Sequence, residues 1–70
     1  MTIVEMERFK GNIFSVTMVS NTEPQELPTS GADLNGELPD DATFAPMSTI
    51  IVPATGAVYI ADEDGVFHKQ

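Results

Sequence analysis

The alternation of hydrophobic and polar positions is clearest in the last third of the chain. Two apolar runs rich in β-branched and aromatic residues, Thr49 to Val52 and Val58 to Ile60, are separated by Ala54-Thr55-Gly56. A second turn, Asp62 to Gly65, precedes a short run that contains Phe67. Such runs, bounded by glycine-containing turns, are typical of antiparallel strands. This stretch therefore predicts a β-meander, with Val58 and Ile60 on one face and Tyr59 on the other.

A fourth strand is predicted upstream, between Ile13 and Val19. Phe14, Val16 and Met18 are two residues apart and would share one face, while the other face is mixed. The first ten residues fit two patterns. Ile3, Met6 and Phe9 have helical spacing, and Val4 and Met6 alternate as in a strand. Residues 1–10 are thus either a flexible arm that orders against a neighbour or a packed first strand.

Residues 21–46 predict a long loop. Four of the five prolines lie there, and proline removes a backbone donor and restricts the residue before it. Leucines and Phe44 recur along the segment and are expected to pin it over the open face of the sheet. Ser30 is expected to cap one helical turn that ends at Asn35-Gly36. After Pro46, we expect a type I turn or an extended entry into the next strand, because Met47 disfavours positive φ.

Together these patterns predict one all-β domain spanning residues 1–70. It would be a small antiparallel meander of about four strands, with the long proline-rich loop over one face. A chain of 70 residues buries a marginal core, and without cysteine it has no disulfide to reinforce it. A homo-oligomer would supply further buried area.

The charge balance limits the partners. The chain carries 11 acidic residues against 3 basic ones, and the cations lie near its ends, at Arg8, Lys10 and Lys69. A net charge of −8 disfavours binding to nucleic acid and to anionic membranes. Neither a signal peptide nor a membrane-spanning apolar stretch is visible, so we expect a cytoplasmic origin.

Candidate chemistry is sparse. Asp62 and Asp64 are the candidate metal ligands, but the calcium-loop pattern also needs an acid at position 60, where Ile60 stands. A hairpin turn with a left-handed Gly65 is the favoured interpretation. His68 stands alone and no nucleophile motif is present, so we expect neither an enzyme nor a cofactor. Contacts with partners are expected at Tyr59 and Phe67, and along an exposed strand edge from Ile13 to Val19.

From Leu27 onward, the chain resembles small proteins encoded among the virion structural genes of tailed bacteriophages and prophages. The likeness rests on Leu38-Pro39-Asp40, on Phe44-Ala45-Pro46-x-Ser48, and on the meander that ends in Gly65-Val66-Phe67. The chain departs from this pattern at Met47, where glycine is expected, and at Phe67, near where tryptophan is frequent. The resemblance implies a non-enzymatic role in a phage head or tail, through contacts with other virion proteins or with itself.

The expected location is then the virion or the host bacterial cytoplasm. An alternative function follows from the charge alone: an acidic inhibitor that imitates DNA and blocks a host nuclease, since spaced carboxylates can stand in for phosphates. The acidic residues are dispersed through loops and clustered only in pairs, such as Asp40-Asp41. This dispersal favours the structural role.

Overall fold

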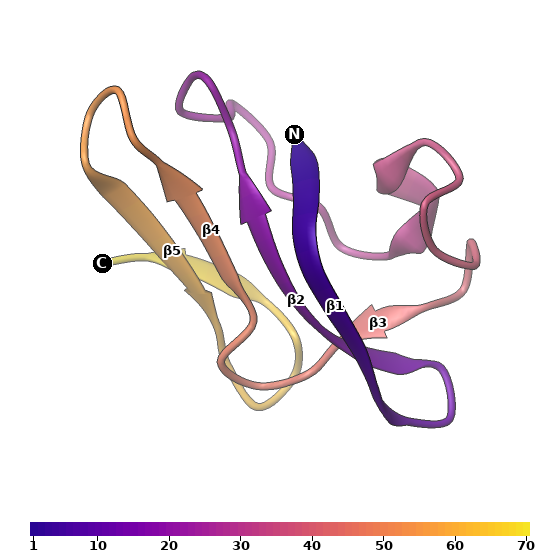
Figure 1. Cartoon of the computed structure of the whole chain (residues 1–70). Coiled ribbons are helices and arrows are strands. Elements are labelled where there is room, and N and C mark those ends of the chain that lie inside the picture. The colour runs from indigo at the N-terminus through magenta and orange to yellow at the C-terminus, as the bar shows by residue number, and fades with distance from the viewer.

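The computed structural model describes all residues from 1 to 70 and contains six strands and one short 3-10 helix (Figure 1). All regular elements other than this four-residue helix are strands, so the all-β prediction is confirmed. In chain order the elements are β1 (Thr2–Lys10), β2 (Ile13–Val19), η1 (Gly31–Leu34), β3 (Thr43–Phe44), β4 (Thr49–Val52), β5 (Ala57–Ala61) and β6 (Phe67–Lys69).

The strands form one mixed sheet in the order β1-β2-β4-β5-β6, and β3 pairs with β2 in line with β4. β1 with β2, β4 with β5, and β5 with β6 are antiparallel. β3 and β4, in contrast, both run parallel to β2. The prediction of a four-stranded antiparallel meander is therefore wrong in strand number and in pairing. The reason is the segment between β2 and β3, which carries the chain back to the start of β2 before it continues in the same direction.

The first ten residues form neither a helix nor an unpaired arm. Thr2–Lys10 is a strand that pairs along the whole of β2. Its register skips one residue between Ile3 and Glu5, and another between Arg8 and Lys10. Val4 and Phe9 are therefore the extra residues of two bulge-like irregularities. The skip at Val4 explains the helix-like spacing, because it brings Ile3 and Met6, three residues apart, onto the same face of the strand.

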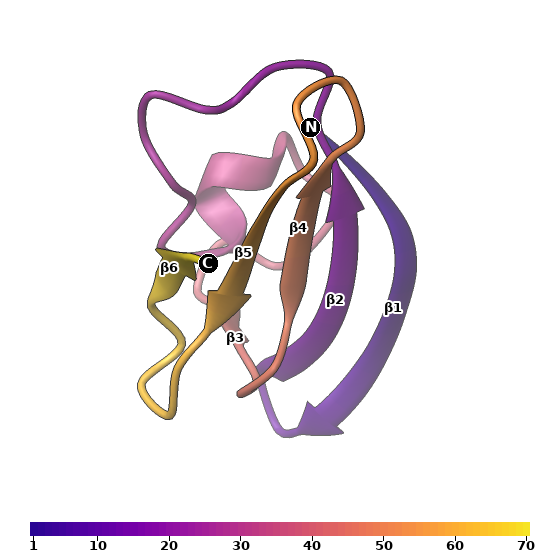
Figure 2. The ribbon, with the colours of Figure 1, turned by 90° about the vertical axis from the view of Figure 1, so that its left-hand side faces the viewer.

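The core lies on one face of the sheet. Alternate residues of β2 and β4 are buried, and on β5 the buried set is Ala57, Tyr59 and Ala61. Val58 and Ile60 share the other face, as predicted, and are half-buried. Figure 2 shows the segment with η1 on one side of the sheet. The buried hydrophobic cluster comprises Phe14, Val16, Met18, Leu34, Leu38, Ala42, Phe44, Ile50, Val52, Ala57, Tyr59, Ala61 and Phe67.

The predicted loop of residues 21–46 is interrupted twice. η1 forms within it, capped by the Ser30 side chain, which accepts a hydrogen bond from Ala32 N, and ended by Asn35 in the left-handed region. This short helix was predicted. Thr43–Phe44 then pairs with β2 as β3, which was not predicted. Two residues are too few to show an alternating pattern, and their pairing depends on the distant β2.

The turn before β4 also differs from the prediction. Met47 has φ +72°, and Ser48 N donates to Ala45 O at 3.2 Å. Proline at the second position cannot take positive φ, so positive φ at the third position makes this a type II turn. The sheet pairings on both sides of the turn impose this geometry on Met47, because Met47 N donates to Ala61 O at 3.0 Å. The side chain of Met47 points into solvent, where nothing opposes it.

Candidate functional site

The most open feature of the fold is the free edge of β1. β1 is the terminal strand of the sheet, spans nine residues, and pairs with β2 on one side only. The opposite terminal strand, β6, has three residues. Val4 and Phe9 are 58% and 62% exposed, and Met6 is exposed between them. A long edge that carries exposed apolar side chains is a template for pairing with another strand.

The same strand carries the only lysine and arginine side chains that are not held in an ion pair. Lys69 Nζ lies 2.6 Å from Glu23 Oε1, and this contact raises the pKa of Lys69. The hydrogen bond that Glu23 accepts from Lys69 lowers the pKa of Glu23. Arg8 instead stacks on the Phe14 ring, with its guanidinium carbon 5.3 Å from the ring centroid. Arg8 and Lys10 are therefore two unpaired cations near the end of β1, with Arg8 on the core face and Lys10 on the open face of the sheet.

The structure does not place the four predicted contact residues on an accessible edge. β2 lies between β1 and β4, so Ile13 and Val19 are half-buried in the interior of the sheet. Tyr59 and Phe67 are 5% and 3% exposed. The Tyr59 hydroxyl donates to Glu23 Oε1 at 3.4 Å, and the Phe67 ring packs on Phe44 with centroids 5.1 Å apart. These two aromatic residues belong to the core.

Sequence reasoning missed the β1 edge for a specific reason. The extra residues Val4 and Phe9 break the period of two that marks a strand, so the segment reads as ambiguous. The sequence signal that distinguishes this segment is its charge order. The acidic residues Glu5 and Glu7 precede the basic residues Arg8 and Lys10.

A second open surface is the face of the sheet opposite the core. Figure 2 shows no segment of the chain covering this side of the sheet. The face carries no charged residue on its three central strands. Its side chains there are Ile13, Ser15, Thr17 and Val19 of β2, Thr49 and Ile51 of β4, and Val58 and Ile60 of β5.

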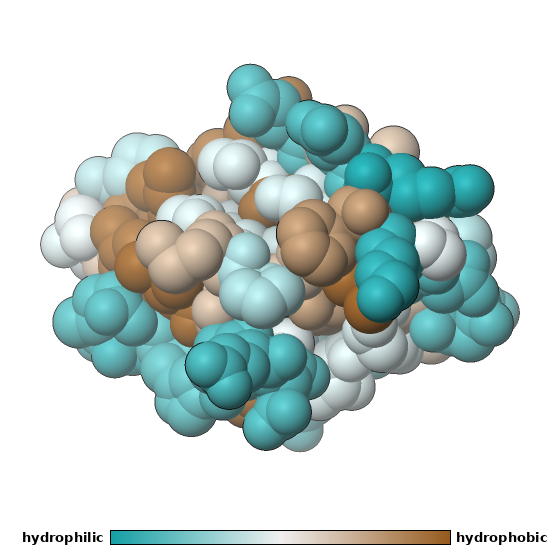
Figure 3. Space-filling view, turned by 90° about the horizontal axis from the view of Figure 1, so that it is seen from below, coloured by the Kyte–Doolittle hydropathy of each residue, from teal (hydrophilic) through white to brown (hydrophobic).

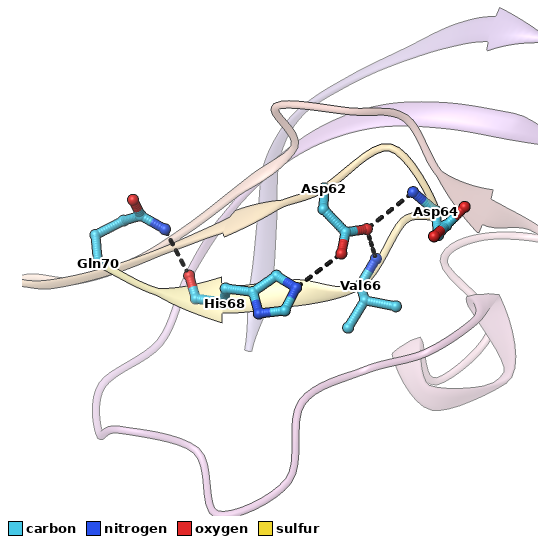
Figure 4. A network of polar contacts seen from close by, with 5 residues as sticks. All are labelled: Asp62, Asp64, Val66, His68 and Gln70. Atoms are coloured by element: carbon cyan, nitrogen blue, oxygen red, sulfur yellow. Dashed lines mark hydrogen bonds and ion pairs between the residues drawn. The ribbon is translucent and has the colours of Figure 1, made fainter.

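The turn between β5 and β6 contains the candidate metal ligands (Figure 4). Asp62 Oδ1 accepts from the backbone N–H of Asp64 at 2.8 Å and of Val66 at 3.0 Å, and Asp62 Oδ2 lies 2.7 Å from His68 Nε2. The bond from Val66, followed by that with His68, lowers the pKa of Asp62. Gly65 has φ +80°, as predicted for the hairpin turn.

The carboxylate of Asp62 is therefore occupied by the turn itself, and the Asp64 side chain points away from it (Figure 4). Nowhere in the chain do three histidine, cysteine or acidic side chains converge as a metal site requires. Asp62 therefore stabilises the hairpin turn. The carboxylates of Asp62 and Asp64 do not converge on one point as metal ligands would.

An open cavity of about 520 Å³ lies between the N-terminus and the segment before η1. Asp33 on its wall accepts hydrogen bonds from the N–H and the hydroxyl of Thr29, and the backbone bond is the main cause of its lowered pKa. Its other lining residues are Met1, Glu26, Leu27, Pro28, Thr29 and Leu34. The acidic side chains of the cavity lining are those of Glu26 and Asp33.

Figure 3 views the end of the molecule where three turns meet, and apolar surface gathers there in areas separated by hydrophilic residues. Phe9, Met47 and Val66, all exposed, adjoin these turns. The structure contains no helix with the length and apolar character of a membrane span. Comparison of the chain with models of protein families, with curated proteins and with solved structures finds no match.

Proposed function

We propose that this protein is a non-enzymatic structural or assembly component of a tailed-phage or prophage virion and acts through protein–protein contacts. The observation that carries the proposal is the free edge of β1, which has exposed apolar residues and both signs of charge. Strand addition at such an edge gives affinity through main-chain hydrogen bonds and needs no cofactor. The uncharged sheet face beside it offers further contact area.

The residues behind the phage resemblance have connected structural roles, which supports the proposal. Phe44 lies in β3, Ala45 N donates to Phe14 O at 2.8 Å, and the Ser48 side chain bonds β2 after the turn at Pro46. The resemblance expects glycine at position 47, and φ there is +72°. A glycine would adopt this turn without strain. The shared pattern is therefore one that specifies the link between β3 and β4.

Co-expression tests the proposal. The tagged chain is produced together with the head and tail proteins of the same phage or prophage region, and proteins that co-purify are identified. We expect recovery of a head or tail protein. Val4→Asp places a charge on the β1 edge and should abolish recovery. Val66→Asp, at a comparably exposed valine outside β1, serves as the matched control and should leave recovery unchanged.

Two outcomes would contradict the proposal. One is the absence of any head or tail protein under conditions where the chain is folded. The other is recovery of a host nuclease that is displaced by added DNA, which would favour the acidic DNA mimic. The net charge of −8 is the property that would allow the chain to imitate DNA in this second outcome.

A further inference from the structure

We propose that two copies of this chain pair through their β1 edges, antiparallel and about a two-fold axis, so that their sheets become one continuous sheet. This inference rests on the proposed function, because it names a second copy of the chain as the partner of the β1 edge and leaves the uncharged sheet face, continuous across both copies, for head or tail proteins. An isologous contact of this kind presents the same strand twice, so the strand must be complementary to itself.

The charge order on β1 has this self-complementarity. Glu5 and Glu7 precede Arg8 and Lys10 along the strand. In an antiparallel pair, the acidic half of each copy lies beside the basic half of the other. Charges at a sheet edge usually prevent pairing. Here their order prevents parallel pairing, which would align like charges, and favours antiparallel pairing.

The pairing with β2 defines which side chains share a face. Glu5, Glu7 and Lys10 lie opposite Thr17, Ser15 and Ile13, so they belong to the open face of the sheet. Met6 and Arg8 lie opposite Val16 and Phe14 and belong to the core face. Phe9 is an extra residue at the irregularity and takes no place in this alternation.

An antiparallel register exists that matches both faces and opposite charges. It places Glu5 of each copy opposite Lys10 of the other, and Met6 opposite Arg8, with the two-fold axis through Glu7. The two Glu5–Lys10 pairs attract, and each methionine covers the aliphatic part of an arginine. The two Glu7 side chains meet at the axis, which is the unfavourable feature of this register.

The choice of a second copy over another occupant follows from the charge distribution. Two molecules of net charge −8 repel one another over most of their surfaces. The β1 strand is the one place where each copy offers two unpaired cations, and it also offers the carboxylates that those cations need. Approach edge to edge is therefore the orientation in which repulsion is lowest.

Sedimentation of the full chain over a range of concentrations tests the proposal. We expect the native chain to dimerise. Lys10→Glu makes the strand acidic throughout and should raise the dimer dissociation constant by about tenfold or more, since it affects both symmetry-related pairs. Glu5→Lys combined with Lys10→Glu exchanges the paired charges, leaves the net charge unchanged, and should restore dimerisation. Glu7→Gln removes the repulsion at the axis and should strengthen it.

A control separates pairing from net charge. Thr22→Glu with Gln25→Glu changes the net charge by the same amount as Lys10→Glu, at exposed positions outside β1, and should weaken the dimer less. Circular dichroism shows whether each variant is folded. A folded native chain that stays monomeric would overturn the proposal, and so would a dimer that the charge exchange does not restore. Either result leaves the co-purification with head or tail proteins to be judged independently.

Discussion

At the scale of single residues, Ser48 explains how the sheet continues past the turn between β3 and β4. The backbone at Pro46 and Met47 leaves the line of β2, which removes a strand partner from Val16. Ser48 is fully buried; its Oγ accepts from Val16 N at 3.2 Å and donates to Phe14 O at 3.4 Å. The side chain thus stands in for the missing backbone partner.

Replacing this serine tests the account. Ser48→Ala leaves the buried Val16 N–H without a partner and should lower the free energy of unfolding by about 1–3 kcal/mol. Chemical denaturation monitored by circular dichroism measures the change. Ser15→Ala, on the exposed face of β2, is the matched control and should have little effect. Equal effects of the two substitutions would contradict the role given to Ser48.

Met47 is a second residue whose backbone conformation should change the free energy of unfolding measurably. A non-glycine residue at φ +72° is strained, and its exposed side chain gains little from packing. Met47→Gly should therefore raise the free energy of unfolding by about 1 kcal/mol, the difference between the relieved strain and the greater freedom of glycine when unfolded. Met47→Ala keeps the Cβ and should give no such gain. A glycine variant no more stable than the alanine variant would disprove the strain.

At the scale of elements, the last hairpin depends on one carboxylate. Asp62 accepts two backbone N–H groups within the turn and also contacts His68 on β6. Position 65 requires glycine, because a Cβ there would lie 2.8 Å from Phe44 O. The turn therefore lies close against β3 while β6 pairs with β5, and Phe67 packs on Phe44.

Acid should weaken this hairpin. Folding lowers the pKa of Asp62 below its ordinary value of 3.8, so folding favours the ionised form. Its contribution to stability is complete above that ordinary value and is lost as the pH falls through the lower pKa of the folded state. We expect Asp62→Asn to reduce stability at neutral pH, and the difference from the native chain to shrink toward pH 2.

Denaturant titrations at several pH values measure this difference. Asp64→Asn is the control, because the Asp64 side chain accepts no hydrogen bond and its loss should not produce the same pH dependence. A difference between the native chain and Asp62→Asn that stayed constant down to the lowest pH would contradict the role of the ionised carboxylate.

At the scale of the whole molecule, charge acts against compactness. Eleven acidic residues face three basic ones, and both the Glu23–Lys69 ion pair and the Asp62–His68 contact are exposed at the surface. Exposed pairs contribute little, whereas repulsion among the remaining carboxylates extends over the surface of a small molecule. The net electrostatic effect at low ionic strength is therefore destabilising.

Added NaCl should raise the midpoint of thermal unfolding at neutral pH. Screening shortens the range of the repulsion to about 8 Å at physiological ionic strength. A gain of about 1 kcal/mol corresponds to a rise of about 4–8 °C for a domain of this size. Scanning calorimetry at constant protein concentration measures it, and KCl should act equally. A midpoint that falls as NaCl is added would show that the exposed ion pairs outweigh the repulsion.

The features that the sequence by itself determined are local. The all-β class, the strand runs at β2, β4 and β5, the capped turn after Ser30 and the left-handed Gly65 all depend on residues a few positions apart. Side-chain alternation, turn chemistry and capping act over that distance, so the printed order of residues is sufficient for them.

Only the tertiary structure decided which strands are neighbours and which faces are buried. The parallel pairing of β3 and β4 with β2, the interior place of Ile13 and Val19, the burial of Tyr59, and the positive φ of Met47 each depend on segments far away in the chain. β1 is the free edge of the sheet, because β2 has neighbours on both sides. Strand pairing and side-chain burial are properties of the packed chain. Each strand has many possible distant partners, and the native pairing is the one that gives the whole chain its lowest free energy.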